Sequence, residues 1–214
     1  MAFDFKKEYK EFYMPGGKPQ IVEVPRMNYV AVRGKGDPNE EGGEYQQAIS
    51  LVYAVAYTIK MSKKGDRRIE GYFDYVVPPL DGLCWSDKGG VFVGSHGVSV
   101  KSSFRWICML RLPDFVGAED FEWALGEVAR KKHLDVGPAE FLSLEEGLCV
   151  QCLHIGSFDS ESRTIALMEE FLSTNGYATD LSDTRRHHEI YLSDFRRTAT
   201  DQLRTVLRLP VKKI

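Results

Sequence analysis

Two segments of the chain show the same order of elements, and this internal repeat limits the possible folds more than any other feature. Each segment has a strand, a turn that contains glycine and aspartate, a helix and a second strand. The predicted elements lie at 29–34, 44–61 and 72–77 in the first copy, and at 148–155, 160–174 and 187–192 in the second. Strand–helix–strand units whose helices cannot cover both faces of a sheet predict an α+β fold with one open concavity.

The spacing of apolar residues in the first copy supports these assignments. Tyr29, Ala31 and Arg33 alternate with Val30 and Val32, and this period of two is typical of a strand. In the following segment the apolar residues recur at helical spacing, which predicts an amphipathic helix. These residues are Ile49, Val52, Tyr53, Ala56 and Tyr57.

Other elements are predicted outside the repeat. Strict alternation over 104–112 predicts a strand. The segment 118–131 has acidic residues early and basic residues late, which favours a helix. The glycine-rich segment 81–100 is interpreted as one or two strands with long turns, and 200–207 as a short terminal helix.

The chain length of 214 residues suits one large domain. We expect residues 1–20 to be an irregular lead-in and residues 21–214 to form a single domain. Within that domain, the copies of the pseudo-repeat would occupy 21–112 and 139–214. No flexible linker separates the two copies, so we expect them to fold together.

Composition indicates a soluble globular protein, with 43% hydrophobic residues, 28% charged residues and a net charge of −3. No basic stripe is present that would attract a phosphate backbone, so we expect no nucleic-acid partner. The longest apolar run, 49–59, is too short to span a bilayer, and we expect no membrane partner. The N-terminus has no apolar signal region, and the four cysteines form no dense framework. We therefore expect a cytoplasmic protein.

The sequence predicts no metal and no cofactor. Cys149 and Cys152 form a single CxxC within a predicted strand, so their side chains should point to opposite faces and pack as small hydrophobic groups. The five histidines show no ligand spacing. Gly34 and Gly36 lie between a strand and a helix, but residue 39 is Asn39, so the dinucleotide-binding pattern fails.

The strand at 187–192 carries the best candidate for a functional residue. Glu189 and Tyr191 share one face of this strand, while Ile190 and Leu192 share the other face, which we expect to cover the core and to face the helices. Glu189 and Tyr191 would then face a concavity, or else water, and an exposed, solvated glutamate is the simpler interpretation.

Aromatic residues on the surrounding elements are candidates for the wall of such a concavity. Packing in the core is the commoner use of aromatic residues at this spacing. The candidates are Tyr53, Tyr57, Tyr75, Trp85, Phe104 and Trp106.

The motifs of the second half resemble the C-terminal unit of the GyrI-like family of small-molecule-binding domains. The matching residues are Gly147-Leu148-Cys149-Val150, His154-Ile155-Gly156-Ser157-Phe158, Tyr177 and His188-Glu189-Ile190-Tyr191-Leu192. His188 replaces an aromatic residue of the family pattern. Further motifs resemble one branch of the family, whose members stand alone without a fused DNA-binding module. These motifs include Pro78-Pro79-Leu80-Asp81-Gly82, Trp106 and Leu112-Pro113-Asp114-Phe115.

The resemblance implies a fold and a site. The fold is a tandem pair of strand–helix–strand–strand units that form a mostly antiparallel sheet with helices and a ligand-binding concavity. In the family, the glutamate that corresponds to Glu189 lies among aromatic residues in the pocket, where it faces lipophilic cations in multidrug-responsive regulators. Those regulators carry an added DNA-binding module, for which residues 1–20 are too short, so we expect no DNA binding by this chain alone.

Three functions follow as hypotheses. In the first, the protein binds bulky amphipathic or aromatic, often cationic, molecules for sensing, sequestration or detoxification. In the second, which some stand-alone members suggest, it is a hydrolase that opens strained cyclopropane rings, with Glu189 as general base. In the third, an aromatic face binds a protein partner.

Overall fold

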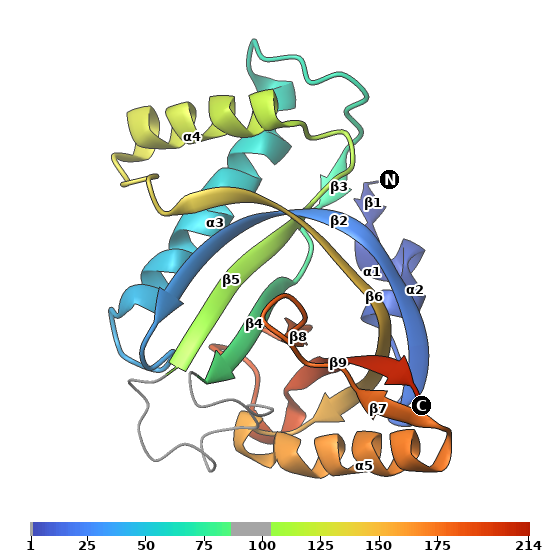
Figure 1. Ribbon diagram of the computed structural model, residues 1–214. Coiled ribbons are helices and arrows are strands. Elements are labelled where there is room, and N and C mark those ends of the chain that lie inside the picture. The colour runs from blue at the N-terminus through green and yellow to red at the C-terminus, as the bar shows by residue number, and fades with distance from the viewer. Residues whose placement is uncertain (1, 87–103) are drawn as a thin grey trace.

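The fold is built on one large antiparallel sheet (Figure 1), seen in a computed structural model that describes residues 2–86 and 104–214. The strands are β1 (Phe3–Asp4), β2 (Gln20–Lys35), β3 (Tyr75–Val76), β4 (Leu80–Ser86), β5 (Phe104–Leu112), β6 (Ala139–Ile155), β7 (Tyr177–Thr179), β8 (His187–Tyr191) and β9 (Arg204–Lys213). The helices are α1 (Phe5–Glu8), α2 (Lys10–Tyr13), α3 (Glu44–Lys60), α4 (Ala118–Lys132) and α5 (Glu161–Thr174). This is the α+β architecture that the sequence predicted.

The sheet closes on itself. Its strand order is β6-β2-β5-β4-β8-β9-β7, and β6 also pairs with β9, so six strands form a ring. Tyr29, Leu83, Ile107, Ile190 and Val206 come from five of these strands and meet in a single buried cluster, which Cys149 of the sixth strand also joins. Because residues from all six strands meet there, this cluster marks the inner face of the ring.

Helices cover parts of the outer face. α3 packs over β2 and β5, where the buried cluster includes Val52, Trp106 and Leu110, and α4 packs against α3. α5 packs over β6 and β9 through Ile165 and Met168. The pair β4 and β8 lies between these two helical layers (Figure 1). The outer face of the sheet therefore has a helix on either side of β8, and this arrangement positions the site described below.

The pairing of the strands supports the proposed pseudo-repeat. β2-α3-β4-β5 and β6-α5-β8-β9 follow the same order along the chain. β2 pairs with its counterpart β6, and β4 pairs with its counterpart β8, both antiparallel. A two-fold relation between the copies would produce these pairings, so we keep the repeat as a proposal with β4, rather than 72–77, as the second strand of the first copy.

Several boundaries differ from the predictions. Only Tyr75–Val76 of the predicted strand 72–77 is extended, and it pairs in parallel with β1. Of the predicted segment 81–100, residues 80–86 form β4, and residues 87–100 lie outside the described part. The predicted terminal helix at 200–207 is wrong, because a single 3₁₀ turn at Thr200–Gln202 leads into strand β9. β9 is buried on both faces, so its apolar residues run without the alternation that reveals a half-buried strand.

The N-terminal segment is not the irregular lead-in that we expected. It forms β1, α1 and α2, and its side chains Phe5, Phe12 and Tyr13 are buried in the inner cluster of the ring. The high charge of this segment suggested a solvent-exposed lead-in. Its buried surface comes from the aromatic residues that lie between the charged ones.

Charged side chains are also buried inside the ring. Arg208 Nη1 lies 2.7 Å from Glu146 Oε1, and Arg208 Nη2 donates to the backbone carbonyl of Phe12 at 2.9 Å. His188 Nδ1 lies 3.0 Å from the other carboxylate oxygen of Glu146, and His188 Nε2 lies 3.6 Å from Asp81. The network thus ties β4, β6, β8 and β9 to the N-terminal segment, and it explains how the ring tolerates a histidine at position 188.

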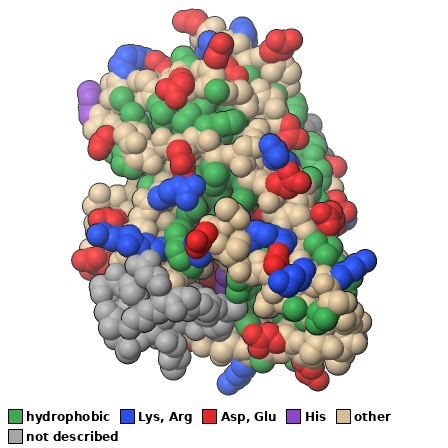
Figure 2. Space-filling view, viewed as in Figure 1, with side chains coloured by type: hydrophobic (Ala, Val, Ile, Leu, Met, Phe, Trp, Pro, Cys, Tyr) green, Lys and Arg blue, Asp and Glu red, His purple; other side chains and the backbone are tan. Residues whose placement is uncertain are grey.

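The surface carries charges of both signs. On the face shown in Figure 2, basic and acidic side chains are interspersed, and hydrophobic side chains lie between them. No helix among the described residues is long and apolar enough to cross a membrane.

Candidate functional site

A cavity of about 500 Å³ lies on the outer face of the ring, where α5 and the N-terminal end of α3 approach β4 and β8. It is lined by Asp37, Pro38, Asn39, Tyr45, Cys84, Phe104, Ser157, Phe158, Asp159, Glu161, Glu189, Tyr191, Phe195 and Thr200. Glu189 and Tyr191 belong to β8, and their neighbour Ile190 faces the inner cluster, as the alternation predicted. The long helices lie on the Glu189 side of the strand, however, and not on the Ile190 side as we had expected.

Glu189 is buried rather than solvated, with only 6% of its surface exposed, so the simpler interpretation of this residue is wrong. The Tyr191 hydroxyl donates a hydrogen bond of 2.9 Å to Glu189 Oε2. Burial raises the pKa of Tyr191 well above its usual value, so this hydroxyl stays protonated and remains a donor. The pair therefore holds a carboxylate in a fixed position on the wall of the cavity.

Gly82 on β4 makes room for this pair. It lies directly opposite Glu189 in the sheet, and a Cβ atom at position 82 would be 3.0 Å from the Tyr191 hydroxyl oxygen. The same atom would be 3.4 Å from the hydroxyl of Tyr45. The two tyrosine hydroxyls thus lie together over a strand position without a side chain, which is a common reason for glycine within a sheet.

A second buried carboxyl group, which the sequence analysis missed, faces the same cavity. Glu161 is the first residue of α5 and only 1% exposed, and its Oε1 has no hydrogen-bond partner among the described residues. Burial raises the pKa of Glu161 well above its usual value, and the nearby charge of Glu189 raises it further. Both effects favour the protonated form of Glu161. In the sequence, Glu161 looks like an ordinary acidic residue at a helix start.

The remaining lining is aromatic and acidic. The ring centroid of Phe158 lies 5.7 Å from that of Tyr191 and 6.4 Å from that of Phe195. Asp37 and Asp159 join the two glutamates, and the described lining contains no lysine or arginine. The cavity thus combines apolar ring surface with an excess of acidic groups.

The predicted aromatic residues separate into three groups. Phe104 and Tyr191 line the cavity. Tyr53 and Tyr57 line a neighbouring compartment that shares Tyr191 with it. Tyr75, Trp85 and Trp106 do not belong to the described lining of the cavity.

Local packing explains the third group. Trp106 is buried beneath α3 against Tyr45, where the absence of a side chain at Gly34 leaves space for its indole ring. Trp85 points to the opposite face of β4 from Cys84 and lies against the Arg186 guanidinium, 4.5 Å from the ring centroid. Tyr75 is buried in the inner cluster.

Metal ligands are not gathered in the described part of the chain, which holds no group of three or more suitable side chains. Cys149 and Cys152 point to opposite faces of β6, one into the inner cluster and one against α5, as predicted. Burial raises the pKa of Cys149 to about 12, so its thiol is unreactive at neutral pH.

Solved structures with the same fold include close relatives. A hydrolase from Listeria innocua is 45% identical, with a TM-score of 0.88, and the match covers 99% of this chain and 100% of that one. An uncharacterized conserved protein from Listeria innocua is also 45% identical, with the same coverage and a TM-score of 0.89. The C-terminal domain of EcmrR shares the fold at 12% identity and a TM-score of 0.54, covering 92% of this chain and 98% of that one.

The family assignment comes from the sequence profile of the GyrI-like small molecule binding domain. No curated protein matches the chain. The profile, however, matches residues 17–212, which include both candidate glutamates and all six strands of the ring except the last residue of β9. The chain therefore belongs to the GyrI-like family of small-molecule-binding domains.

Proposed function

We propose that the protein binds amphipathic aromatic cations in the cavity at Glu189, for sensing, sequestration or detoxification. One observation carries the proposal: the described lining combines aromatic rings with four carboxyl groups and has no basic side chain. Rings attract a cation through their negatively charged faces, with about 0.5–2 kcal/mol for each good contact.

Glu189 is the group expected to give charge selectivity. A buried carboxylate is costly without an opposite charge, and a bound cation supplies that charge. Tyr191 donates one hydrogen bond to Oε2 of Glu189. The carboxylate can accept further hydrogen bonds, so it can also contact a ligand. A neutral ligand of the same shape gains the apolar contacts but not this interaction.

Substitution of Glu189 tests the proposal. The ligands are 10-methylacridinium, a flat aromatic cation, and acridine, which is uncharged at pH 8 and has nearly the same shape. Glu189→Gln should weaken binding of the cation about ten- to a hundredfold, which corresponds to the loss of a charge-assisted contact, and change binding of acridine little. Glu169→Gln is the matched control, because Glu169 is an exposed glutamate on α5.

Fluorescence titration of the three proteins gives the dissociation constants. Equal weakening of both ligands by Glu189→Gln would assign Glu189 a structural role. An unchanged affinity for both ligands would place the binding site elsewhere.

Hydrolysis of a strained ring is the second candidate function. A hydrolase from Listeria innocua is 45% identical over the whole chain, and the cavity holds two buried carboxyl groups, Glu189 and Glu161. A pair of carboxyl groups that line one cavity can supply a general base and a general acid. Glu189 would act as base and Glu161 as acid on a cyclopropane that is conjugated to a carbonyl group.

The proposed step adds one water molecule. Glu189 removes a proton from water while the water oxygen bonds to a ring carbon, and the ring carbon–carbon bond breaks. Its electron pair moves to the conjugated carbonyl oxygen, which Glu161 protonates. Mass spectrometry after incubation with such a compound would detect a product heavier by one water, whereas binding with the compound recovered intact supports the first function alone.

A further inference from the structure

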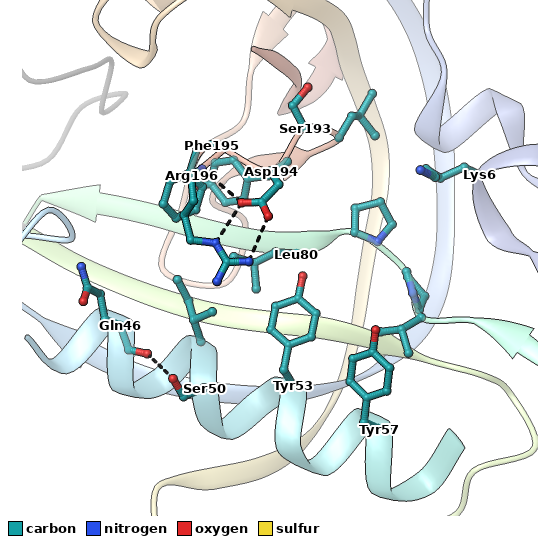
Figure 3. A pocket seen from close by; sticks show the side chains of 16 residues that line it. Lys6, Gln46, Ser50, Tyr53, Tyr57, Leu80, Ser193, Asp194, Phe195 and Arg196 are labelled. Carbon is teal, nitrogen blue, oxygen red and sulfur yellow. Dashed lines mark hydrogen bonds and ion pairs between the residues drawn. The ribbon is translucent and has the colours of Figure 1, made fainter. Parts of the chain in front are cut away.

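A second compartment of about 430 Å³ lies beside the Glu189 cavity and has a different lining (Figure 3). It is bounded by α3, by the turn Pro78–Pro79, by the segment 192–196 and by Lys6 of α1. Tyr191 and Phe195 belong to the lining of both compartments. The two compartments are therefore neighbours that share part of one aromatic wall.

The charge of this compartment is opposite to that of the Glu189 cavity. Its charged residues are Lys6, Arg196 and Asp194. Arg196 donates to both carboxylate oxygens of Asp194, at 2.9 and 3.0 Å, so these two residues neutralise each other. Two cations and one anion leave a net charge of +1, and Lys6 supplies it.

The Lys6 ammonium group is available to a ligand. Its side chain forms no ion pair within the described residues, and it is only partly exposed. The backbone at this position is fixed, because the Lys6 N–H donates to the Asp4 side chain at 3.1 Å. In Figure 3 the Lys6 side chain points from α1 toward the other side chains of the compartment.

The opposite wall presents flat rings and hydroxyl groups. Tyr53 and Tyr57 stack with their ring centroids 6.2 Å apart and their planes inclined by 28°. Figure 3 shows both side chains extending from α3 into the compartment. Burial raises the pKa of Tyr53 to about 12, so its hydroxyl remains a neutral donor. A planar ring can contact these tyrosines while its polar substituent reaches the lysine.

We propose that this compartment is a second binding site, specific for planar aromatic groups that carry an anionic oxygen substituent such as a sulfonate or carboxylate. Lys6 pairs with the anion, the tyrosine hydroxyls donate to its oxygens, and the rings and prolines contact the aromatic part. The site does not depend on Glu189, so its test is independent of the function proposed for the first cavity.

Isothermal titration calorimetry with two matched ligands tests the site. 2-Naphthalenesulfonate carries the anion, and 2-naphthalenesulfonamide is its neutral analogue of nearly the same shape. Wild-type protein should bind the sulfonate about two- to fivefold more tightly than the sulfonamide, as a partly exposed charge contact predicts. Lys6→Met should abolish that preference, whereas Lys10→Met, which removes an exposed lysine of α2 outside the compartment, should preserve it.

Two further variants locate the bound ligand. Ser50→Trp fills the compartment from the exposed side of α3 and should abolish binding of both naphthalenes. Glu189→Gln should leave both affinities unchanged. The proposal is overturned if wild-type protein shows no preference for the sulfonate, if Lys6→Met keeps the preference, or if Ser50→Trp binds both ligands normally. Tighter sulfonate binding by Glu189→Gln would place the anion in the first cavity and also overturn it.

Discussion

Substitution of His188 should reveal a charge inside the ring that stabilises the fold. The carboxylates of Glu146 and Asp81 flank this fully buried imidazole, and their charges raise its pKa from 6.5 to about 9 against the opposing effect of burial. A difference of about 2.5 pH units, at 1.36 kcal/mol per unit, corresponds to about 3 kcal/mol of stability.

The sign of the pH dependence follows from the raised pKa. The folded protein binds the His188 proton more tightly than the unfolded chain does. This contribution is fully present below pH 6.5 and is lost as the pH rises through about 9. His188→Gln removes the charge and retains a polar side chain, so the variant should be about 3 kcal/mol less stable than wild type at pH 6 and should approach it at pH 9.5.

Urea denaturation of both proteins between pH 6 and 9.5 measures this difference. Buried cysteines whose pKa values are raised also destabilise the fold at high pH, but they do so in both proteins, and the difference between the curves isolates His188. Equal stability of the two proteins at pH 6 would show that the charge on His188 does not stabilise the fold. An imidazole that titrates near pH 6.5 by NMR would show the same.

Three further substitutions test packing at single positions. Gly82→Ala should push the Tyr191 hydroxyl away from Glu189 and weaken binding of 10-methylacridinium about five- to tenfold in fluorescence titration; unchanged affinity would show that the hydrogen bond is dispensable. Gly34→Ala would place a Cβ 2.2 Å from the Trp106 ring and should cost about 1–3 kcal/mol in urea denaturation. Its control, Gly126→Ala within α4, meets no atom within 4 Å and should stabilise the fold by about 0.5–1 kcal/mol. Phe5→Ala should cost about 3 kcal/mol, and a neutral result would show that the N-terminal segment does not support the ring.

Much of the fold could be predicted from local patterns in the sequence. β5, α3 and α5 matched because each has a clear period of two or of about 3.6. β9 was misread because both of its faces are buried, and the N-terminal segment was misread because its aromatic residues are separated by charges. Closure of the sheet depends on β6 pairing with β9, and a pairing between distant segments leaves no local pattern.

The site was predictable only in part. Strand alternation placed Glu189 and Tyr191 on one face, and the structure places both in a single cavity. Glu161 could not be recognised, because its burial depends on the approach of α5 to β8, which no spacing along α5 encodes. The aromatic residues could not be sorted between wall and core, because a neighbouring glycine such as Gly34 decides how deep a ring such as Trp106 sits.

A crystal structure of the complex with 10-methylacridinium would locate the bound cation. We expect the acridinium ring to lie in the cavity against Phe158 and Tyr191. Its charged nitrogen should lie nearer to the Glu189 carboxyl group than to those of Asp37 and Asp159, and within roughly 6 Å of a ring face, where cation–π attraction acts. An acridinium bound outside this cavity, or bound inside it with its nitrogen turned away from Glu189, would show that Glu189 does not bind the cation.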